Sequence, residues 1–230
     1  MISVVIPAYN HASSLARCLE SLFAQEDVQV EIIVVNDGST DGTRAVLLPF
    51  QDRITTVHQE NAGANVARNR GAKRAQGAFL LFVDADATFE RRALWHLRRA
   101  LESHPEIGFA YSDFYFGFKH FRTGPFDERQ LRRMNFIHIS ALMRRELFVE
   151  FDESMRRFQD WDLWLTFLKQ GIRGLYVPKT LMRVTVERTG ISSWLPKWSY
   201  HAPWKWLPGV RRRVQAYEQA REVLIKKHDL

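Results

Sequence analysis

An unbroken apolar run that ends in two carboxylates constrains the fold of this chain more than any other feature. Residues 79–83 are all apolar, and Asp84-Ala85-Asp86 follows them directly. A short continuous apolar run is typical of a strand covered on both faces, although the pattern alone also allows a turn of buried helix. Residues 88–101 then predict a helix. Because ligands gather at the carboxyl ends of parallel strands, we expect both aspartates at such an edge.

The spacing of Asp84 and Asp86 allows their carboxylates to converge on one cation. Only the small residue Ala85 separates them. Mg²⁺ or Mn²⁺ prefers oxygen ligands and is commonly held by one or two carboxylates together with substrate phosphates. The alternative is an acidic turn that solvates the end of a strand, and an Asp-x-Asp sequence by itself is a weak signal.

Length and cysteine content narrow the class of protein. With 230 residues, 46% of them hydrophobic, the chain can bury the core of one sizeable domain, with or without an appendage. Its apolar runs are too short to span a bilayer, and Met1 leads directly into a strand-like run, so we expect no secretory signal. Cys18 is the only cysteine, which excludes an intramolecular disulfide and favours a reducing, cytoplasmic compartment. Its helical spacing with neighbouring leucines predicts a core residue, not a catalytic one.

The formal net charge of +7 favours anionic partners such as phosphorylated substrates or anionic lipid. Nucleic acid is disfavoured, because the chain has no zinc-finger spacing, no aromatic RNA-binding strand motif and no Arg-rich recognition helix.

The composition changes near the C-terminus. From residue 192 the sequence mixes four tryptophans with prolines and lysines, and a basic helical pattern follows. We therefore predict a domain of residues 1–191 and a basic, Trp-rich appendage of residues 192–230. Tryptophan favours the bilayer interface and basic side chains favour anionic headgroups, so the appendage either makes a peripheral contact with the cytoplasmic face of a membrane or packs on protein.

Strand-like and helix-like segments alternate in the first half of the chain, which predicts an α/β fold with a mostly parallel, Rossmann-like open sheet and helices on both faces. The strand-like segments are residues 2–7, 30–35, 54–58 and 79–83. Asn61 can cap a helix of residues 62–76, whose small side chains would let it approach the sheet closely.

The second half of the chain is less regular. Residues 119–135 predict a long polar loop that could move over a site. Residues 159–170 predict a helix that ends at Gly171. The other predicted elements are strands at 107–118, 136–143, 175–177 and 181–186, and a short helix at 144–150.

Five motifs in order resemble the family 2 glycosyltransferases of the GT-A fold. The matching text is SVVIPAYN, EIIVVNDGSTDGT, NAGANVARNRG, FLLFVDADATFE and QDWDLWLTFLKQG. Each motif alone is a weak indication of the family, but five motifs in this order and with this spacing are a specific one. Together they cover residues 2–180. The resemblance implies a nucleotide-sugar donor (UDP-, GDP- or dTDP-linked), a Mg²⁺ or Mn²⁺ ion, inversion at the anomeric carbon, and a glycan or lipid-linked acceptor in cell-surface polysaccharide or glycolipid synthesis.

The resemblance also implies which residues bind the donor. They stand at the first and second strand ends, in the third helix and in the acidic motif: Pro7, Tyr9, Asn10, Asp37, Arg68, Asp84 and Ala85. Asp84 and Asp86 would hold the metal, with Asp86 making the direct contact. Two alternatives stay open, since Asp37 also fits a turn residue before Gly38 and Arg68 also fits a surface arginine.

Asp160 matches the catalytic base of the resembled family. It would accept the proton of the acceptor hydroxyl, although an acidic residue at a helix start also fits a purely electrostatic role. Gln159 stands where the family usually has Glu, which removes one charge from the motif. Glu187 and Arg188 occupy positions where the family has phosphate-binding residues. The phosphate contact is therefore a second point at which this sequence departs from the family pattern.

The acceptor side is the least specified part of the predicted site. His138 and Trp161 would line it, while a lone histidine in an apolar segment is more commonly a core residue.

Three other classes of protein are alternatives to this interpretation. A sugar nucleotidyltransferase needs a Gly-rich basic loop after the first strand, and a dinucleotide-dependent oxidoreductase needs G-x-G-x-x-G there; Pro7-Ala8-Tyr9-Asn10 is neither. A catalytically silent nucleotide-sugar-binding module remains the third alternative, because Gln159 replaces an acid.

Overall fold

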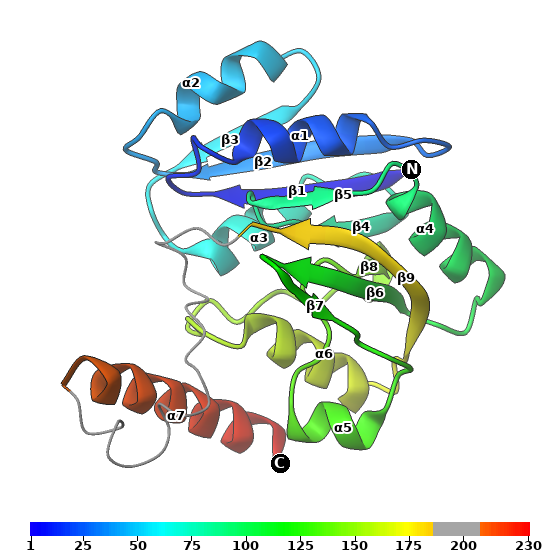
Figure 1. Ribbon diagram of the computed structural model, residues 1–230, viewed down its shortest axis with the longest axis vertical. Helices are drawn as coiled ribbons and strands as arrows, with labels where there is room; N and C mark the ends of the chain where they lie inside the picture. Colours follow the sequence, from blue (N-terminus) through cyan, green and yellow to red (C-terminus); the bar gives the residue numbers. More distant parts are fainter. Residues whose placement is uncertain (186–207) are drawn as a thin grey trace.

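The computed structural model describes residues 1–185 and 208–230 (Figure 1). The predictions for Glu187, Arg188 and the Trp-rich segment therefore lie outside the described residues. Among the helices of the described part, none is long and apolar enough to cross a bilayer.

One mixed sheet organises the described residues. Its order is β3-β2-β1-β4-β8-β6-β9-β5, with β7 paired to β6. The strands are β1 (Ile2–Ala8), β2 (Val30–Asp37), β3 (Thr55–Gln59), β4 (Phe79–Phe82), β5 (Ala87–Phe89), β6 (Phe109–Phe116), β7 (Lys119–Phe121), β8 (Leu142–Arg144) and β9 (Gly174–Val184).

The parallel half of the sheet consists of β3, β2, β1 and β4. The apolar runs of β1, β2 and β4 are buried on both faces, as the unbroken pattern of β4 predicts, whereas only Val57 is buried in the edge strand β3. β8 joins β4 to β6 through two antiparallel pairings, so β6 and β9 run in the same direction as β4. The carboxyl ends of all these parallel strands therefore share one edge of the sheet.

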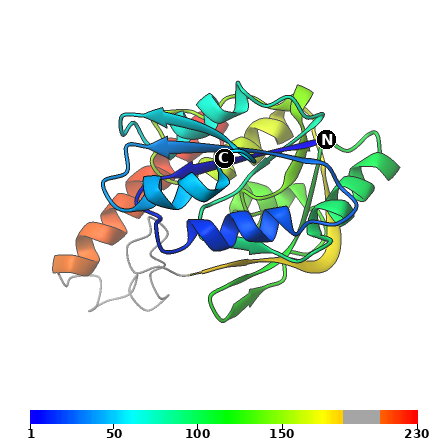
Figure 2. The ribbon, with the colours of Figure 1, turned by 90° about the horizontal axis from the view of Figure 1, so that it is seen from above.

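Helices cover both faces of the sheet (Figures 1 and 2). One face packs on α1, α2 and α4, and the other packs on α3, α5 and α6, with α7 outside α6. The helices are α1 (Leu15–Phe23), α2 (Thr43–Leu47), α3 (Ala64–Ala72), α4 (Ala93–Ser103), α5 (Glu128–Arg133), α6 (Gln159–Lys169) and α7 (Pro208–His228), with short 3₁₀ turns at Leu48–Phe50 and Arg145–Leu147.

The close approach of α3 to the sheet confirms the expectation from its small residues. A Cβ atom at Gly71 would lie 2.4 Å from Cγ1 of Val5 and 3.2 Å from Cγ2 of Val35. Only glycine fits at this contact, so α3 lies directly on β1 and β2.

The helix start predicted at Thr88 is wrong. Residues Ala87–Phe89 form β5, which pairs antiparallel with β9, and α4 begins only at Ala93. The β-branched and aromatic residues Thr88 and Phe89 suit a strand, and the pairing with a distant segment decides the outcome.

The second half of the chain is more regular than its sequence predicts. The expected loop at 119–135 contains β7 and α5, whose first turn is capped by Asp127 through the backbone N–H groups of Arg129 and Gln130. The two strands expected on either side of Pro178 are one strand, β9, because a bulge skips Pro178 and Lys179 in the pairing with β6.

Two further local predictions are wrong. Residues 136–143 are not a strand apart from the start of β8; the segment turns inward, with Ile137 and Ile139 buried. Asn61 does not cap α3, which is preceded by Gly63 at φ 101°; the Asn61 side chain instead donates to the carbonyl of Asp37.

Candidate active site at the carboxyl edge of the sheet

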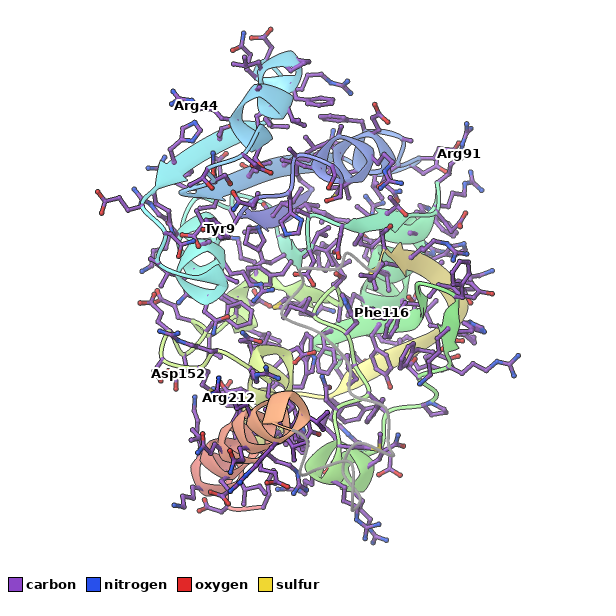
Figure 3. The ribbon with its side chains drawn as sticks, turned by 60° about the vertical axis from the view of Figure 1, so that its left-hand side comes forward. Tyr9, Arg44, Arg91, Phe116, Asp152 and Arg212 are labelled. Atoms are coloured by element: carbon purple, nitrogen blue, oxygen red, sulfur yellow. The ribbon has the colours of Figure 1, made fainter. Side chains whose placement is uncertain are left out.

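The ends of β1 and β2 form the first wall of the site. Tyr9 directly follows β1, is 45% exposed, and is labelled in Figure 3. Asn10 has a left-handed backbone (φ 58°), and its side-chain oxygen accepts from the N–H groups of Thr40 and Asp41 at 2.8 and 3.3 Å. Asn10 thus fastens the β2 loop to the end of β1, while the ring of Tyr9 remains open to a ligand.

Asp37, at the end of β2, is buried and already accepts three hydrogen bonds. One oxygen accepts from Gln59 Nε2 (2.7 Å) and from the N–H of Ala62 (2.8 Å), and the other accepts from the N–H of Gly63 (2.9 Å). The carboxylate therefore shapes the loop that leads into α3. Since two carboxylate oxygens offer about four acceptor positions, Asp37 retains little capacity for a ligand.

An ion pair joins α3 to the end of β4. Arg68 is 7% exposed, and its Nη2 lies 2.9 Å from Oδ1 of Asp84. Nη1 donates to Asn65, and the guanidinium lies 5.5 Å from the ring centre of Phe151. The Nε of Arg68 is buried and has no hydrogen-bond partner in the part of the chain that the structure describes. Arg68 is thus an inward-facing charge rather than a surface arginine.

Asp84 and Asp86 both lie half-buried at the end of β4. Burial alone would raise the pKa of Asp84, but Arg68 and then His138 hold this pKa below its ordinary value, so Asp84 is ionised. No group of three or more His, Cys, Asp or Glu residues suited to a metal occurs within residues 1–185 and 208–230. Carboxylate oxygens are ligands that suit Mg²⁺ or Mn²⁺, and two of them would leave the other coordination positions to substrate phosphates and water.

Cys18 of α1 lies directly behind this acidic motif. It is fully buried, and its Sγ is 3.8 Å from the carbonyl oxygen of Asp84. Burial, followed by the charges of Asp86 and Asp84, raises the pKa of the thiol far above its ordinary value. Cys18 therefore stays protonated, which confirms its assignment to the core.

His138 lies within the site next to Asp84. Its Nε2 is 3.9 Å from Oδ2 of Asp84, and its Nδ1 accepts the backbone N–H of Ser140 at 3.1 Å. The second contact leaves the proton of a neutral ring on Nε2, facing the site. Burial lowers the pKa of His138, although Asp84 and Asp160 both act to raise it. The imidazole is therefore neutral near pH 7.

Asp160 lies in the first turn of α6. Its Oδ2 accepts from Asn135 Nδ2 at 2.7 Å, and its Oδ1 accepts from the N–H of Trp161 at 2.8 Å. Burial raises the pKa of Asp160, and this effect exceeds the lowering by His138 and by the backbone hydrogen bond. Asp160 is thus a stronger base than an ordinary aspartate.

The remaining predicted site residues are buried or half-buried. Trp161 is 3% exposed, and its Nε1 donates to the carbonyl of Leu131 at 2.7 Å, so it can influence an acceptor only through the position of α5. Pro7 is half-buried within β1, and Ala85 is buried between the two metal-ligand candidates. Gln159 is half-buried at the start of α6.

Sequence reasoning missed Asn135 and Asn65. Asn135 holds the base candidate, and Asn65 holds Arg68 while donating to the carbonyls of Asp152 and Met155. Asn65 lies within the matched NAGANVARNRG motif, which was a usable signal. Asn135 follows a short polar helix, and no pattern there indicates its partner 25 residues later.

Two surface hollows of the described part lie away from these residues. Both include Pro125, Phe126 and Arg173, and the second extends to Ile107 and Gly174 near the amino ends of β6 and β9. They occupy the edge of the sheet opposite the aspartates. The chemistry of the side chains, not the size of a cavity, therefore identifies the candidate site.

The topology and the acidic strand end together define a GT-A-type α/β protein. Residues 3–164 match the model of the family described as Glycosyl transferase family 2. This match spans more than half of the chain, so the chain belongs to glycosyl transferase family 2.

Curated relatives share both short and long stretches with the chain. The "Uncharacterized glycosyltransferase YibD" of Escherichia coli is 44% identical over 88 residues, which cover 37% of this chain and 26% of YibD. The "Putative teichuronic acid biosynthesis glycosyltransferase TuaG" of Bacillus subtilis is 28% identical over 216 residues, which cover 84% of this chain and 82% of TuaG. The chain thus corresponds to about a quarter of YibD but to most of TuaG.

Solved structures share the fold. Residues 1–349 of S. aureus TarS in complex with UDP-GlcNAc superpose with a TM-score of 0.73 at 20% identity, covering 84% of this chain and 61% of that one. The mannosyltransferase PcManGT from Pyrobaculum calidifontis, in complex with GDP-Man and Mn²⁺, gives a TM-score of 0.66 at 23% identity, covering 82% and 58%.

Replacement of Asp37 by alanine tests its hold on the loop before α3. We expect Asp37→Ala to lower the free energy of unfolding by about 1–3 kcal/mol, since three donors lose a charged acceptor. Urea denaturation measures this change. The control Asp52→Ala alters an exposed aspartate and should change the free energy of unfolding by no more than about 0.5 kcal/mol relative to the wild type. An unchanged midpoint for Asp37→Ala would mean that the carboxylate serves a ligand alone.

Proposed function

We propose that this chain is a metal-dependent, inverting glycosyltransferase that moves a sugar from a nucleotide-sugar donor to an acceptor hydroxyl. The arrangement of Asp84 and Asp160 carries the proposal. Asp84 is ionised at the strand end, 3.9 Å from His138, while Asp160 has a raised pKa at the start of α6, and the charges of both carboxylates act on the pKa of His138. Two carboxylates of different basicity around one space suit a reaction with a leaving side and an attacking side.

The leaving side is assigned to Asp84, Asp86 and Arg68. A divalent ion bound by the two aspartates would offset the negative charge that develops on the departing diphosphate. Arg68 supplies a permanent positive charge beside the same position. Tyr9 offers an exposed ring for the nucleotide base, and Asp37 holds the adjoining loop.

The attacking side is assigned to Asp160. As the acceptor oxygen bonds to the anomeric carbon, the bond between that carbon and the diphosphate oxygen breaks, and the hydroxyl proton passes to Asp160. Asn135 and the backbone N–H of Trp161 each hold one oxygen of Asp160, which fixes the orientation of the carboxylate. Attack from the face opposite the diphosphate inverts the anomeric carbon.

The relatives support the class of substrate. UDP-GlcNAc and GDP-Man are bound by proteins of the same fold, and TuaG is named for teichuronic acid biosynthesis. We accordingly propose a UDP-, GDP- or dTDP-linked donor and a role in cell-surface polysaccharide or glycolipid synthesis. A panel of these nucleotide sugars, scored by hydrolysis and thermal stabilisation with and without Mn²⁺, identifies the donor. A silent binding module would be stabilised by a donor but would turn over none.

Donor binding should depend on the metal through Asp86. In calorimetry with UDP or GDP, we expect affinity to fall by roughly tenfold or more in EDTA or in Asp86→Ala, because the diphosphate then loses its bridging cation. Glu90→Ala, an exposed acid four residues away, is the matched control and should bind normally. Equal affinity with and without metal would contradict metal dependence.

Asp160→Asn should lower the transfer rate by roughly 10²–10⁴-fold while donor affinity stays the same, since only the proton acceptor is removed. Because burial raises the pKa of Asp160, its ionised form costs folding stability near pH 7, so the variant should unfold at the same or a higher temperature. The same shift puts the acid limb of the wild-type pH–rate profile above the ordinary carboxyl range. A near-native transfer rate for Asp160→Asn would show that Asp160 is not the catalytic base, and Glu187 would be the next candidate.

The appendage is proposed to make a peripheral contact with an anionic membrane at the cytoplasmic face. Within it, α7 presents exposed Arg211 and Arg212, and the four tryptophans of its first part lie outside the described residues. Each basic residue near an anionic surface contributes on the order of 1 kcal/mol. Flotation with anionic liposomes should recover the wild type and lose a variant with these tryptophans changed to alanine. Equal recovery of both would assign the tryptophans to protein packing.

A further inference from the structure

The C-terminal helix α7 docks on the catalytic domain next to α6 (Figure 1). Leu224 of α7 is fully buried and joins the core cluster that contains the buried face of α6, and Val214 is 6% exposed. Lys169 at the end of α6 donates to the carbonyl of Lys227 at 2.9 Å. The contact therefore combines a buried apolar residue with polar bonds, and it lies on the helix whose first turn carries the proposed base.

Both oxygens of Asp162 are held by α7. Oδ1 lies 2.7 Å from Nε2 of His228, and Oδ2 lies 3.0 Å from Nζ of Lys227. Asp162 and His228 are almost fully buried, at 5% and 3% exposure. A buried carboxylate is tolerated only with such partners, so the position of Asp162 is tied to α7. Asp162 lies in the first turn of α6, two residues after Asp160.

The segment that enters α6 is also held by α7. Lys227 Nζ contacts Oδ2 of Asp152 at 2.8 Å, and Figure 3 shows Asp152 beside α7. Phe158, the residue before α6, has a left-handed backbone (φ 61°) that a bulky side chain rarely adopts, and its ring packs edge-on against Tyr217 of α7 at 5.1 Å. α7 thus stabilises an unusual backbone at the point where α6 begins.

The opposite side of this segment is fixed by α3. Asn65 donates to the carbonyls of Asp152 and Met155, and Asn69 donates to that of Phe151. α3 also carries Arg68, which is paired with Asp84. The entry to α6 is therefore fixed between α3, which serves the donor side, and α7.

We propose that Lys227 and His228 are positioning residues that hold Asp160 in its productive place through Asp162. The proposal rests on the proposed function of Asp160. Misplacement of a catalytic group by about 1 Å can lower a rate by roughly 10²-fold, so a contact two residues from the base is close enough to matter. The tail of the chain then completes the active site without touching either substrate.

The first experiment compares full-length variants by release of the matching nucleoside diphosphate (UDP, GDP or dTDP) from whichever UDP-, GDP- or dTDP-sugar the wild type turns over. We expect His228→Ala to lower kcat by roughly 10- to 100-fold with an unchanged KM for the donor. His228→Gln retains a donor for Asp162 and should recover most of the rate. Lys227→Met is a second variant that keeps the apolar stem, and Lys226→Met, an exposed neighbour, is the matched control.

The second experiment separates positioning from general stability. His228→Ala is combined with Asp160→Asn. If His228 acts through Asp160, the double variant should retain the residual rate of Asp160→Asn, because the two changes remove one effect. A merely structural role would lower the rate by the same factor in both backgrounds, and that result would overturn the proposal.

The remaining outcomes are also decisive. Native kcat in folded His228→Ala and Lys227→Met would overturn the positioning role and leave the proposed function intact. A wild type that turns over none of the nucleotide sugars would overturn the proposed function and the positioning role with it. Thermal unfolding of each variant identifies those that are folded at the assay temperature.

Discussion

The ion pair between Arg68 and Asp84 is the interaction on which the rest of the site depends. It joins a helix on one face of the sheet to the end of a central strand, with the Arg68 side chain largely withdrawn from water and the Asp84 side chain partly so. A guanidinium in this setting needs a carboxylate, and the carboxylate needs the guanidinium to remain charged. The pair therefore keeps Asp84 ionised, and both of its charges act on the pKa of His138.

The parallel half of the fold could be predicted because its signals are local. The apolar runs of β1, β2 and β4, each followed by turn or acidic residues, give both the strands and the edge where the site lies. The antiparallel half could not be predicted in the same way. β5 forms because β9 lies beside it, and β9 continues past Pro178 through a bulge; both facts depend on partners far along the chain.

The candidate site likewise has residues that local sequence signals predict and residues that depend on distant partners. Acidic residues at strand ends and the small residues of α3 could be recognised from residue type and spacing. Their partners could not, since Asn135 meets Asp160 across 25 residues and His228 meets Asp162 across 66. Residue type also fails to show what a side chain is used for. Asn10 and Asp37 suit a ligand by chemistry, yet much of their hydrogen-bonding capacity holds neighbouring loops.

The absence of a side chain at Gly71 has a consequence beyond packing. Gly71 lies one helical turn from Arg68, so both residues share the face of α3 that meets the sheet. A single added carbon would push against Val5 and Val35 and lift this face of the helix. The guanidinium would rise with it, away from the strand end. The distance between Arg68 and Asp84 thus depends on Gly71 having only a hydrogen atom as its side chain, although Gly71 contacts neither of them through a functional group.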